Sequence, residues 1–302
     1  MIEFRGFTKL FGAHAAVRGL DFQVAAGETV ALLGPNGSGK TTSLKAAAGL
    51  VRPTAGEVLV GAPPRRALEP AARRAISFLP QKVAFPEALT GREVVDFYAA
   101  LRGVPRGRVD DALKMASLNG ASSRAVGTYS GGMVQRLGLA VAVLPEADVL
   151  LLDEPTAALD PDGLAAFYGH VEQRRHEGRT VLFTSHQLGD VERLADRFGV
   201  LVEGRLVASL GQRELADELA RRGVMRLRLA PGAPGARERA TALVQGATWQ
   251  ADELVVPGPP SRWPAALETL RAGGTEILAL TAEEGRLDQL YRELVERTTC
   301  EH

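Results

Sequence analysis

The residues "GPNGSGKTT" (34–42) are the strongest indicator of the fold class in this sequence. They match the pattern G-x-x-x-x-G-K-[ST], and they lie between an apolar run, "ETVALLG" (28–34), and a segment that can form a helix up to Gly49. A buried strand, a glycine-rich turn and a helix form the context in which this pattern binds phosphate, because successive backbone N–H groups and the helix N-terminus face the anion. The sequence therefore predicts a phosphate-binding P-loop in an α/β protein.

The side chains of this loop have distinct expected roles. Lys40 should pair with the β- and γ-phosphates, Thr41 offers its hydroxyl to Mg²⁺, and Thr42 can reach another phosphate oxygen. A glycine-rich turn that only leads into a helix is the alternative, and the agreement of residue types, spacing and flanks disfavours it. The predicted phosphate-binding residues are Gly34, Pro35, Asn36, Gly37, Ser38, Gly39, Lys40, Thr41 and Thr42.

A second apolar run ends in two acids within "LLLDEPTAALD" (150–160). The run predicts a buried strand, so Asp153 should emerge beside the phosphates, where it can hold the magnesium shell. By strand alternation Glu154 points elsewhere, and it can orient or deprotonate an attacking water. A helix-capping pair is the alternative, which the presence of the P-loop disfavours.

Two further polar residues also follow strands. His186 comes after "TVLFTS" (180–185), and a parallel strand beside that of Asp153 would bring the imidazole within reach of a γ-phosphate. Gln81 ends a strand in "SFLPQ" (77–81); taken alone it is more often a loop amide than a ligand. The remaining histidines considered, His14, His170 and His176, fit ordinary surface or core hydrogen-bonding roles.

Composition narrows the class of protein. The 302 residues include 36 basic and 36 acidic side chains, so no net charge attracts nucleic acid. The single cysteine, Cys300, excludes an internal disulfide and fits a reducing compartment. Apolar runs such as Leu137 to Leu144 are far shorter than the about 20 residues that span a bilayer. Charges interrupt the N-terminus before a signal-peptide block can form. We expect a cytoplasmic protein.

Periodicity divides the chain into two domains. In residues 1–222, strands that alternate polar and apolar residues (2–24) predict an antiparallel β subdomain, and buried strands separated by helices predict a parallel-sheet core. A helical insert occupies about 86–140. Residues 225–302 alternate strands and helices and predict a small βαββαβ-like α+β domain with a final helix.

Over about its first 220 residues the chain resembles the nucleotide-binding subunit of ABC transporters. The resemblance rests on an ordered series of motifs: the P-loop, Gln81, "YSGGM" (129–133), "LLLDEP" (150–155), "AALD" (157–160) and "SH" (185–186). It implies a P-loop ABC ATPase fold that binds and hydrolyses ATP with Mg²⁺, with Lys40, Glu154 and His186 as catalytic residues. A P-loop kinase or GTPase would not explain "YSGGM" or His186.

The resemblance also implies roles for residues outside the P-loop. Phe11 would stack on the adenine, which is worth about 1 to 3 kcal/mol for a base on a ring, and Val17 would flank it. Taken alone, Phe11 could equally be a strand core residue. Gln81 would join the magnesium shell, with Thr41 and Asp153, and would sense the membrane partner. Asp160 would cross the interface with a second copy of the chain.

The "YSGGM" stretch would face the nucleotide of that second copy. Ser130 would donate its hydroxyl, and the amides of Gly131 and Gly132, at a helix N-terminus, would meet the γ-phosphate. An ordinary helix N-cap is the alternative for this stretch alone. Many ABC signatures read L-S-G-G-Q, and the Tyr129 and Met133 found here resemble the branch that serves ABC-2-type membrane partners.

The resemblance predicts the partners as well. An integral membrane permease would dock on residues 82–104, where we expect Val83, Phe85 and Pro86 to be exposed, although they could instead pack the helical insert. The subunit would then lie on the inner face of the membrane through the permease. The C-terminal domain would strengthen the ATPase pair, by similarity to tails of ABC-2-type ATPases.

Within this branch the sequence, including "GRLDQLYRELVER" (285–297), is most similar to that of the ATPase that serves copper and sulfur delivery to nitrous-oxide reductase. That similarity implies a periplasmic copper-handling protein as a further partner of the complex. The alternative is another ABC-2-type exporter, of drugs, lipids or haem-related compounds, because such exporters share much of this sequence. An ABC ATPase that works without a membrane is a further alternative, but such proteins usually carry paired cassettes, a long coiled coil or zinc-binding cysteines.

Overall fold

The computed structural model describes residues 1–157, 159–230 and 236–300. The chain divides into two compact units, Met1–Ser209 and Leu210–His302. We expected the first domain to extend to residue 222. The division instead falls before helix α8 (Gln212–Arg221), because α8 packs against α11 (Leu287–Cys300) and the Arg222 guanidinium bonds the Glu293 carboxylate at 2.9 Å.

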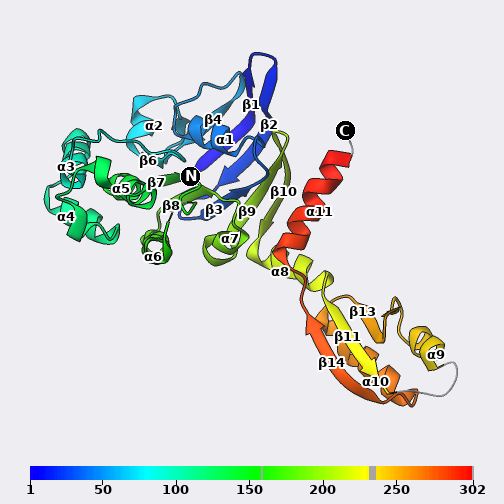
Figure 1. The fold of residues 1–302 in the computed structure, drawn as a ribbon. Helices are drawn as coiled ribbons and strands as arrows, with labels where there is room; N and C mark the ends of the chain where they lie inside the picture. The colour runs from blue at the N-terminus through cyan, green and yellow to red at the C-terminus, as the bar shows by residue number, and fades with distance from the viewer. Residues whose placement is uncertain (158, 231–235, 301–302) are drawn as a thin grey trace. The chain divides into compact units, whose positions relative to one another are not determined.

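A six-stranded sheet with the strand order β10-β9-β3-β8-β7-β6 forms the centre of the first unit (Figure 1). The bounds of its strands are β3 (Thr29–Leu33), β6 (Ile76–Leu79), β7 (Val149–Asp153), β8 (Thr180–Thr184), β9 (Arg197–Val202) and β10 (Arg205–Gly211). Strands β3, β7 and β8 are parallel and buried throughout, which explains their uninterrupted apolar sequences. Thr184 pairs with both Leu32 and Asp153, so the carboxyl ends of the three strands lie at one edge of the sheet.

Helices flank this edge and connect its strands. The P-loop precedes α1 (Lys40–Ala47), and the crossover between β7 and β8 contains α6 (Pro161–His176). Helix α7 (Leu188–Leu194) follows β8, and the short α2 (Pro70–Arg74) precedes β6. The expected strand–helix–strand arrangement of a parallel sheet is therefore present.

An antiparallel sheet with the order β2-β1-β4-β5 forms the predicted β subdomain. Its strands are β1 (Ile2–Phe11), β2 (His14–Val24), β4 (Ala55–Val60) and β5 (Arg65–Arg66). Alternate residues such as Phe4 and Phe22 point into a core that also contains Leu32 of β3 and Leu44 of α1. The two sheets of this unit thus share one hydrophobic core.

The helical insert lies between β6 and β7 and consists of α3 (Gly91–Arg102), α4 (Gly107–Met115) and α5 (Gly131–Val143), with short 3₁₀ turns at Asn119–Ala121 and Val126–Thr128. Figure 1 shows the three helices together, and α5 also packs on β6. A capping box opens α3: the Thr90 hydroxyl accepts the Glu93 N–H, and the Glu93 carboxylate accepts the Thr90 N–H. Gly103, at φ 66°, ends the helix.

The second unit contains a four-stranded antiparallel sheet with the order β12-β13-β11-β14. Its elements after α8 are β11 (Val224–Leu229), α9 (Ala236–Leu243), β12 (Thr248–Gln250), β13 (Glu253–Pro257), a 3₁₀ turn (Pro260–Arg262), α10 (Trp263–Ala272), β14 (Ile277–Glu283) and α11. This is the predicted βαββαβ order with a final helix, around a separate core that includes Met225, Leu254 and Leu270. Within the described residues, no helix combines the length and apolar character needed to cross a bilayer.

Candidate nucleotide site

Two glycines of the P-loop are required by both conformation and space. Gly34 and Gly39 have φ values of 152° and 102°, which side chains rarely adopt. A Cβ on Gly34 would lie 2.1 Å from the Leu201 carbonyl oxygen, and one on Gly39 would lie 2.6 Å from that of Ala16. These contacts bring the loop down onto the sheet, so its backbone can turn directly into α1.

Lys40 lies inside this loop. Its ammonium donates to the carbonyl oxygens of Gly34, at 2.7 Å, and Pro35, at 3.1 Å. Burial lowers the pKa of Lys40, while the charges of Glu154 and Asp153 act in the opposite direction. A phosphate group in the loop would compensate this burial, because an opposite charge favours the ammonium form.

A pocket of about 450 Å³ opens beside the loop. It is lined by Phe11, His14, Ala16, Asn36, Gly37, Ser38, Gly39, Lys40, Thr41, Thr42, Gln81 and Glu154. The pocket therefore brings together predicted residues from β1, the P-loop and the ends of β6 and β7. Its volume is in the range of small-molecule sites.

The adenine-side predictions have different outcomes. Phe11 lines the pocket with 52% of its surface exposed, so it is not a strand core residue, and the Lys9 ammonium lies 4.9 Å from its ring centre. Val17 is fully buried behind Gly39 and does not line the pocket. His14, which we expected to have an ordinary role, does line it, because the β1–β2 register places it opposite Phe11. The short turn between Phe11 and His14 was the sequence signal that could have predicted His14 beside Phe11 in this pocket.

Asp153 is completely buried at the end of β7. Its Oδ1 accepts hydrogen bonds from Thr41 Oγ1 at 3.0 Å and Thr184 Oγ1 at 2.8 Å. Its Oδ2 is buried and has no hydrogen-bond partner among the described residues. Burial raises the pKa of Asp153, which the two hydroxyl bonds partly oppose. A free carboxylate oxygen next to a threonine hydroxyl fits the all-oxygen coordination that Mg²⁺ prefers.

Glu154 has a left-handed backbone, with φ 49°. Strand β7 ends at Asp153, so this turn, and not the strand alternation we assumed, directs the Glu154 side chain into the pocket. Its Oε2 accepts a hydrogen bond from Gln81 Nε2 at 2.7 Å and lies 3.6 Å from His186 Nδ1. Gln81, after β6, and His186, after β8, therefore meet at the Glu154 carboxylate, which follows the strand between them.

The "YSGGM" residues lie outside this pocket. Ser130 caps α5, where its Oγ accepts the Met133 N–H at 3.3 Å, and Ser130 and Gly131 are exposed. The N-cap interpretation is thus correct, and it does not conflict with a contact to a second copy. Asp160 likewise caps α6, accepting the Gly163 N–H at 2.9 Å, and its other oxygen lies 3.5 Å from Arg136 Nη2.

The predicted docking segment is only partly exposed. Val83 is half-buried against Gly138, since a Cβ on Gly138 would lie 2.7 Å from the Val83 side chain. Phe85 is half-buried against Tyr98, with 6.1 Å between the centres of the two rings. Pro86 is exposed. The large exposed apolar side chains of this region are Phe97 (59%) and Leu101 (67%) on α3, an i, i+4 pair that we did not single out.

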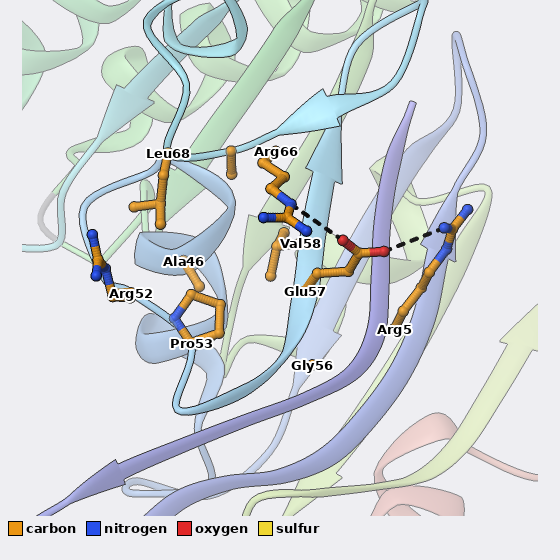
Figure 2. A pocket seen from close by; sticks show the side chains of 10 residues that line it. Arg5, Ala46, Arg52, Pro53, Gly56, Glu57, Val58, Arg66 and Leu68 are labelled. Atoms are coloured by element: carbon orange, nitrogen blue, oxygen red, sulfur yellow. Dashed lines mark hydrogen bonds and ion pairs between the residues drawn. The ribbon is translucent and has the colours of Figure 1, made fainter.

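A larger hollow, of about 670 Å³, lies elsewhere in the first unit (Figure 2). It is lined by Arg5, Ala46, Arg52, Pro53, Gly56, Glu57, Val58, Arg66, Ala67 and Leu68. Figure 2 shows the Glu57 carboxylate between Arg5, at 3.3 Å, and Arg66, at 3.5 Å. Its charges are largely paired and it contains none of the predicted nucleotide residues, so size does not identify the active site here.

Comparisons with known proteins agree with this geometry. The family model described as ABC transporter matches residues 17–157. A daunorubicin resistance ATP-binding protein, DrrA3, from Streptomyces coeruleorubidus is 34% identical over 96% of this chain and 94% of its own length. A Nod factor export ATP-binding protein I from Burkholderia lata is 40% identical over 68% of this chain and 69% of its own length.

The solved structures include the dimeric post-hydrolysis state of the ATP-binding cassette MJ0796, bound to ADP and Pi. It has a TM-score of 0.65 and 27% identity to this chain, and the match covers 70% of this chain and 98% of that one. The chain thus has the fold of an ATP-binding cassette, and it is an ATPase of that fold. Identity of this extent to the two relatives shows that the chain belongs to the ABC transporter family, as an ATP-binding subunit.

Proposed function

We propose that the chain is the ATP-hydrolysing subunit of an ABC-2-type exporter, and that two copies close around two ATP molecules to drive a membrane permease. The observation that carries this proposal is the convergence of Gln81 and His186 on the Glu154 carboxylate beside the P-loop. A carboxylate with an amide and an imidazole at its oxygen can hold an attacking water and take its proton.

The pocket supports a division of tasks along the nucleotide. The exposed Phe11 ring offers a face to the adenine, and the P-loop amides and Lys40 face the phosphates. Asp153 Oδ2 and the Thr41 hydroxyl would hold Mg²⁺, and Gln81, which lines the same pocket as Thr41, would join them. The bound ion would neutralise phosphate charge.

For hydrolysis, Glu154 takes a proton from water as the water oxygen bonds to the γ-phosphorus and the bond from that phosphorus to the bridging oxygen breaks. Gln81 and His186 hold the carboxylate and the transferred phosphoryl group in place. The left-handed turn at Glu154 is a costly conformation, of about 1–3 kcal/mol, of the kind that is retained at functional sites.

The exposed start of α5 supports the dimer. Ser130, Gly131 and Gly132 do not line the pocket of their own chain, and a Cβ on Gly131 would meet no atom within 4 Å. The helix N-terminus is therefore open to the phosphates of a second copy, which is how we assign these residues. We assign Asp160 to the same interface. Removal of the γ-phosphate would then separate the copies.

The permease would bind the helical insert, using Pro86 and the α3 pair Phe97 and Leu101. In that arrangement the subunit would lie on the inner face of the membrane. The names of the relatives above refer to daunorubicin resistance and Nod factor export, which favours an exporter. The similarity to the copper and sulfur system, with its periplasmic partner, stays a prediction, and co-purification of the native membrane partner would test it.

Replacing Glu154 with glutamine tests the hydrolytic assignment. Glu154→Gln should retain ATP binding, lose most turnover and yield a persistent ATP-bound dimer, because the amide cannot accept the proton of the water. Turnover is measured as phosphate release and the dimer by light scattering after size exclusion. Glu192→Gln, the same chemical change on the exposed side of α7, should behave like the parent. Parental turnover in Glu154→Gln would refute the assignment.

A further inference from the structure

The carboxylate of Asp190, on α7, is buried between the two loops that carry Glu154 and His186. Asp190 is 2% exposed. Its Oδ2 accepts hydrogen bonds from Thr156 Oγ1 at 2.6 Å and Ser185 Oγ at 2.9 Å, and its Oδ1 accepts one from Tyr168 OH at 2.6 Å. Among the described residues it has no ion pair with lysine or arginine. A buried carboxylate is costly unless it is hydrogen-bonded, so these three hydroxyls are what hold it there.

The three donors come from different elements. Thr156 lies two residues after Glu154 in the loop that follows β7, Ser185 lies directly before His186 at the end of β8, and Tyr168 is on α6. Burial, the hydrogen bond to Asp190 and the charge of Asp190 together raise the pKa of Tyr168 to about 12, with burial as the largest cause. That shift agrees with a Tyr168 hydroxyl that donates to the Asp190 carboxylate.

Ser185 transmits the position of Asp190 to the backbone around His186. Ser185 Oγ accepts the Gln187 N–H at 2.9 Å. Its own hydroxyl has two acceptors, Asp190 Oδ2 at 2.9 Å and the Gln187 carbonyl oxygen at 3.2 Å, of which the carboxylate is the nearer. The residues on both sides of His186 are therefore held by one hydroxyl. The His186 side chain is itself 55% exposed, so surrounding side chains do little to orient it.

The loop after β7 needs similar support. Glu154 is held in the left-handed region at φ 49°, and its N–H donates to Thr184 Oγ1 at 2.8 Å. A non-glycine residue persists there only where its surroundings enforce it. The Thr156 bond to Asp190 lies on the other side of the same turn. Both loops thus depend on one carboxylate, and their side chains meet with 3.6 Å between Glu154 Oε2 and His186 Nδ1.

We propose that Asp190 is a positioning residue for ATP hydrolysis: through Thr156 and Ser185 it holds the loops that follow β7 and β8 in the arrangement that brings Glu154 and His186 together. Asp190 itself lies outside the pocket lining. This inference rests on the hydrolytic roles proposed above for Glu154 and His186.

Matched substitutions at Thr156 test it kinetically in the full chain. Thr156→Val keeps the shape of the side chain and removes the hydroxyl, and it should lower kcat about tenfold with KM for ATP changed less than about twofold, as expected when reacting groups are misplaced but the substrate is still bound. Thr156→Ser keeps the hydroxyl and should retain most of kcat. Ser185→Ala and Asp190→Asn should repeat the loss, and Thr156→Val combined with Asp190→Asn should lose little more than Asp190→Asn alone.

Arg174→Met separates positioning from stability. Arg174 is also buried and hydrogen-bonded, to His170 Nε2 at 3.2 Å and to the Val143 carbonyl at 2.9 Å, and none of its hydrogen bonds to described residues reaches either loop. Its replacement should lower the melting temperature and leave kcat unchanged. If the parent hydrolyses ATP and Thr156→Val and Thr156→Ser have the same kcat, the proposal for Asp190 is overturned.

Hydrogen exchange provides a readout that does not need turnover. The Asp190→Asn chain should exchange amides faster than the parent in residues 150–157 and 184–190, where Glu154 and Gln187 lose support, and Arg174→Met should not. Unchanged protection in both segments would overturn the proposal for Asp190. Absence of ATP hydrolysis by the parent would instead refute the proposed function and leave the exchange result as the test of Asp190.

Discussion

The ring of Phe11 is half exposed at the mouth of the nucleotide pocket, at the end of β1. The preceding aromatic residues of the strand, Phe4 and Phe7, are fully or almost fully buried. A strand pattern alone cannot distinguish these environments, because a ring at a strand end can point into the core or over a ligand. At the residue scale, exposure is what makes Phe11 a candidate for base stacking.

Phe11→Ala should therefore weaken ATP binding by about 1–3 kcal/mol, the usual value of a base stacked on a ring, with little change in the melting temperature. Phe11→Tyr should bind ATP like the parent, since it retains the ring. Titration with a fluorescent ATP analogue measures the affinity, and calorimetry measures the melting. A drop in stability at unchanged affinity would show that the ring serves the fold.

At the scale of elements, Tyr129 connects the start of α5 to α3. Its hydroxyl donates to the Ala121 carbonyl at 2.8 Å, and burial raises its pKa. A Cβ on Gly91, the first residue of α3, would lie 2.2 Å from that hydroxyl. The tyrosine that distinguishes "YSGGM" from the commoner signature thus requires a glycine at position 91.

Gly91→Ala should accordingly destabilise the chain by about 1–3 kcal/mol, the typical cost of an overpacked contact. Adding Tyr129→Phe removes the clashing oxygen, so the double variant should be more stable than the two single losses predict. Urea unfolding of the four chains measures this coupling. Additive losses would show that the Gly91 contact is relieved in another way.

Helix α6 contains a buried base, His170, next to Arg174. Burial, followed by the positive charges of Arg174 and Arg108, lowers the pKa of His170 to about 3. The unfolded chain binds a proton at this histidine below its ordinary pKa of 6.5, whereas the folded chain does not until about pH 3. Between these values the unfolded state binds more protons, so stability must fall as the pH falls.

His170→Gln should reduce that dependence. Below the unfolded pKa of His170, we expect the free energy of unfolding of the parent to fall by up to about 1.4 kcal/mol per pH unit because of this group. In the variant it should fall correspondingly less. Urea midpoints at pH 7 and pH 5 measure the difference. His176→Gln, at an exposed position near the end of the same helix, is the control and should follow the parent.

At the scale of the whole molecule, the two units have separate hydrophobic cores, one around β1, β3 and α1 and one around β11 and β13. A unit with its own core can in principle fold alone. We therefore expect the first unit to keep the nucleotide pocket without the second.

A chain shortened after Gly211 should bind ATP like the parent. If residues 225–302 strengthen the ATPase pair, the shortened Glu154→Gln chain should form its ATP-bound dimer with a dissociation constant about tenfold higher, which corresponds to 1.4 kcal/mol. Light scattering over a concentration series measures this. Unchanged dimerisation and ATP hydrolysis would refute the role of the C-terminal domain.

Much of this molecule could be predicted from signals within a few residues: the spacing of the P-loop, the Thr90–Glu93 capping box, the apolar strands and the βαββαβ order of the second unit. Strand order in a parallel sheet then placed Asp153, Glu154 and His186 at one edge. These features depend on local propensity and on general rules of sheet topology.

Other features depended on contacts between distant residues. Examples are the left-handed turn that aims Glu154, the place of Val17 behind the P-loop, and the half-burial of Val83 while Phe97 stays exposed. The assignment of α8 to the second unit is another.

The fold class and the residue types of the site can be predicted from the amino-acid sequence, because both follow from short patterns. The pairing of polar groups depends on tertiary packing instead, since a buried carboxylate such as Asp190 takes its partners from wherever packing brings a hydroxyl within hydrogen-bond reach.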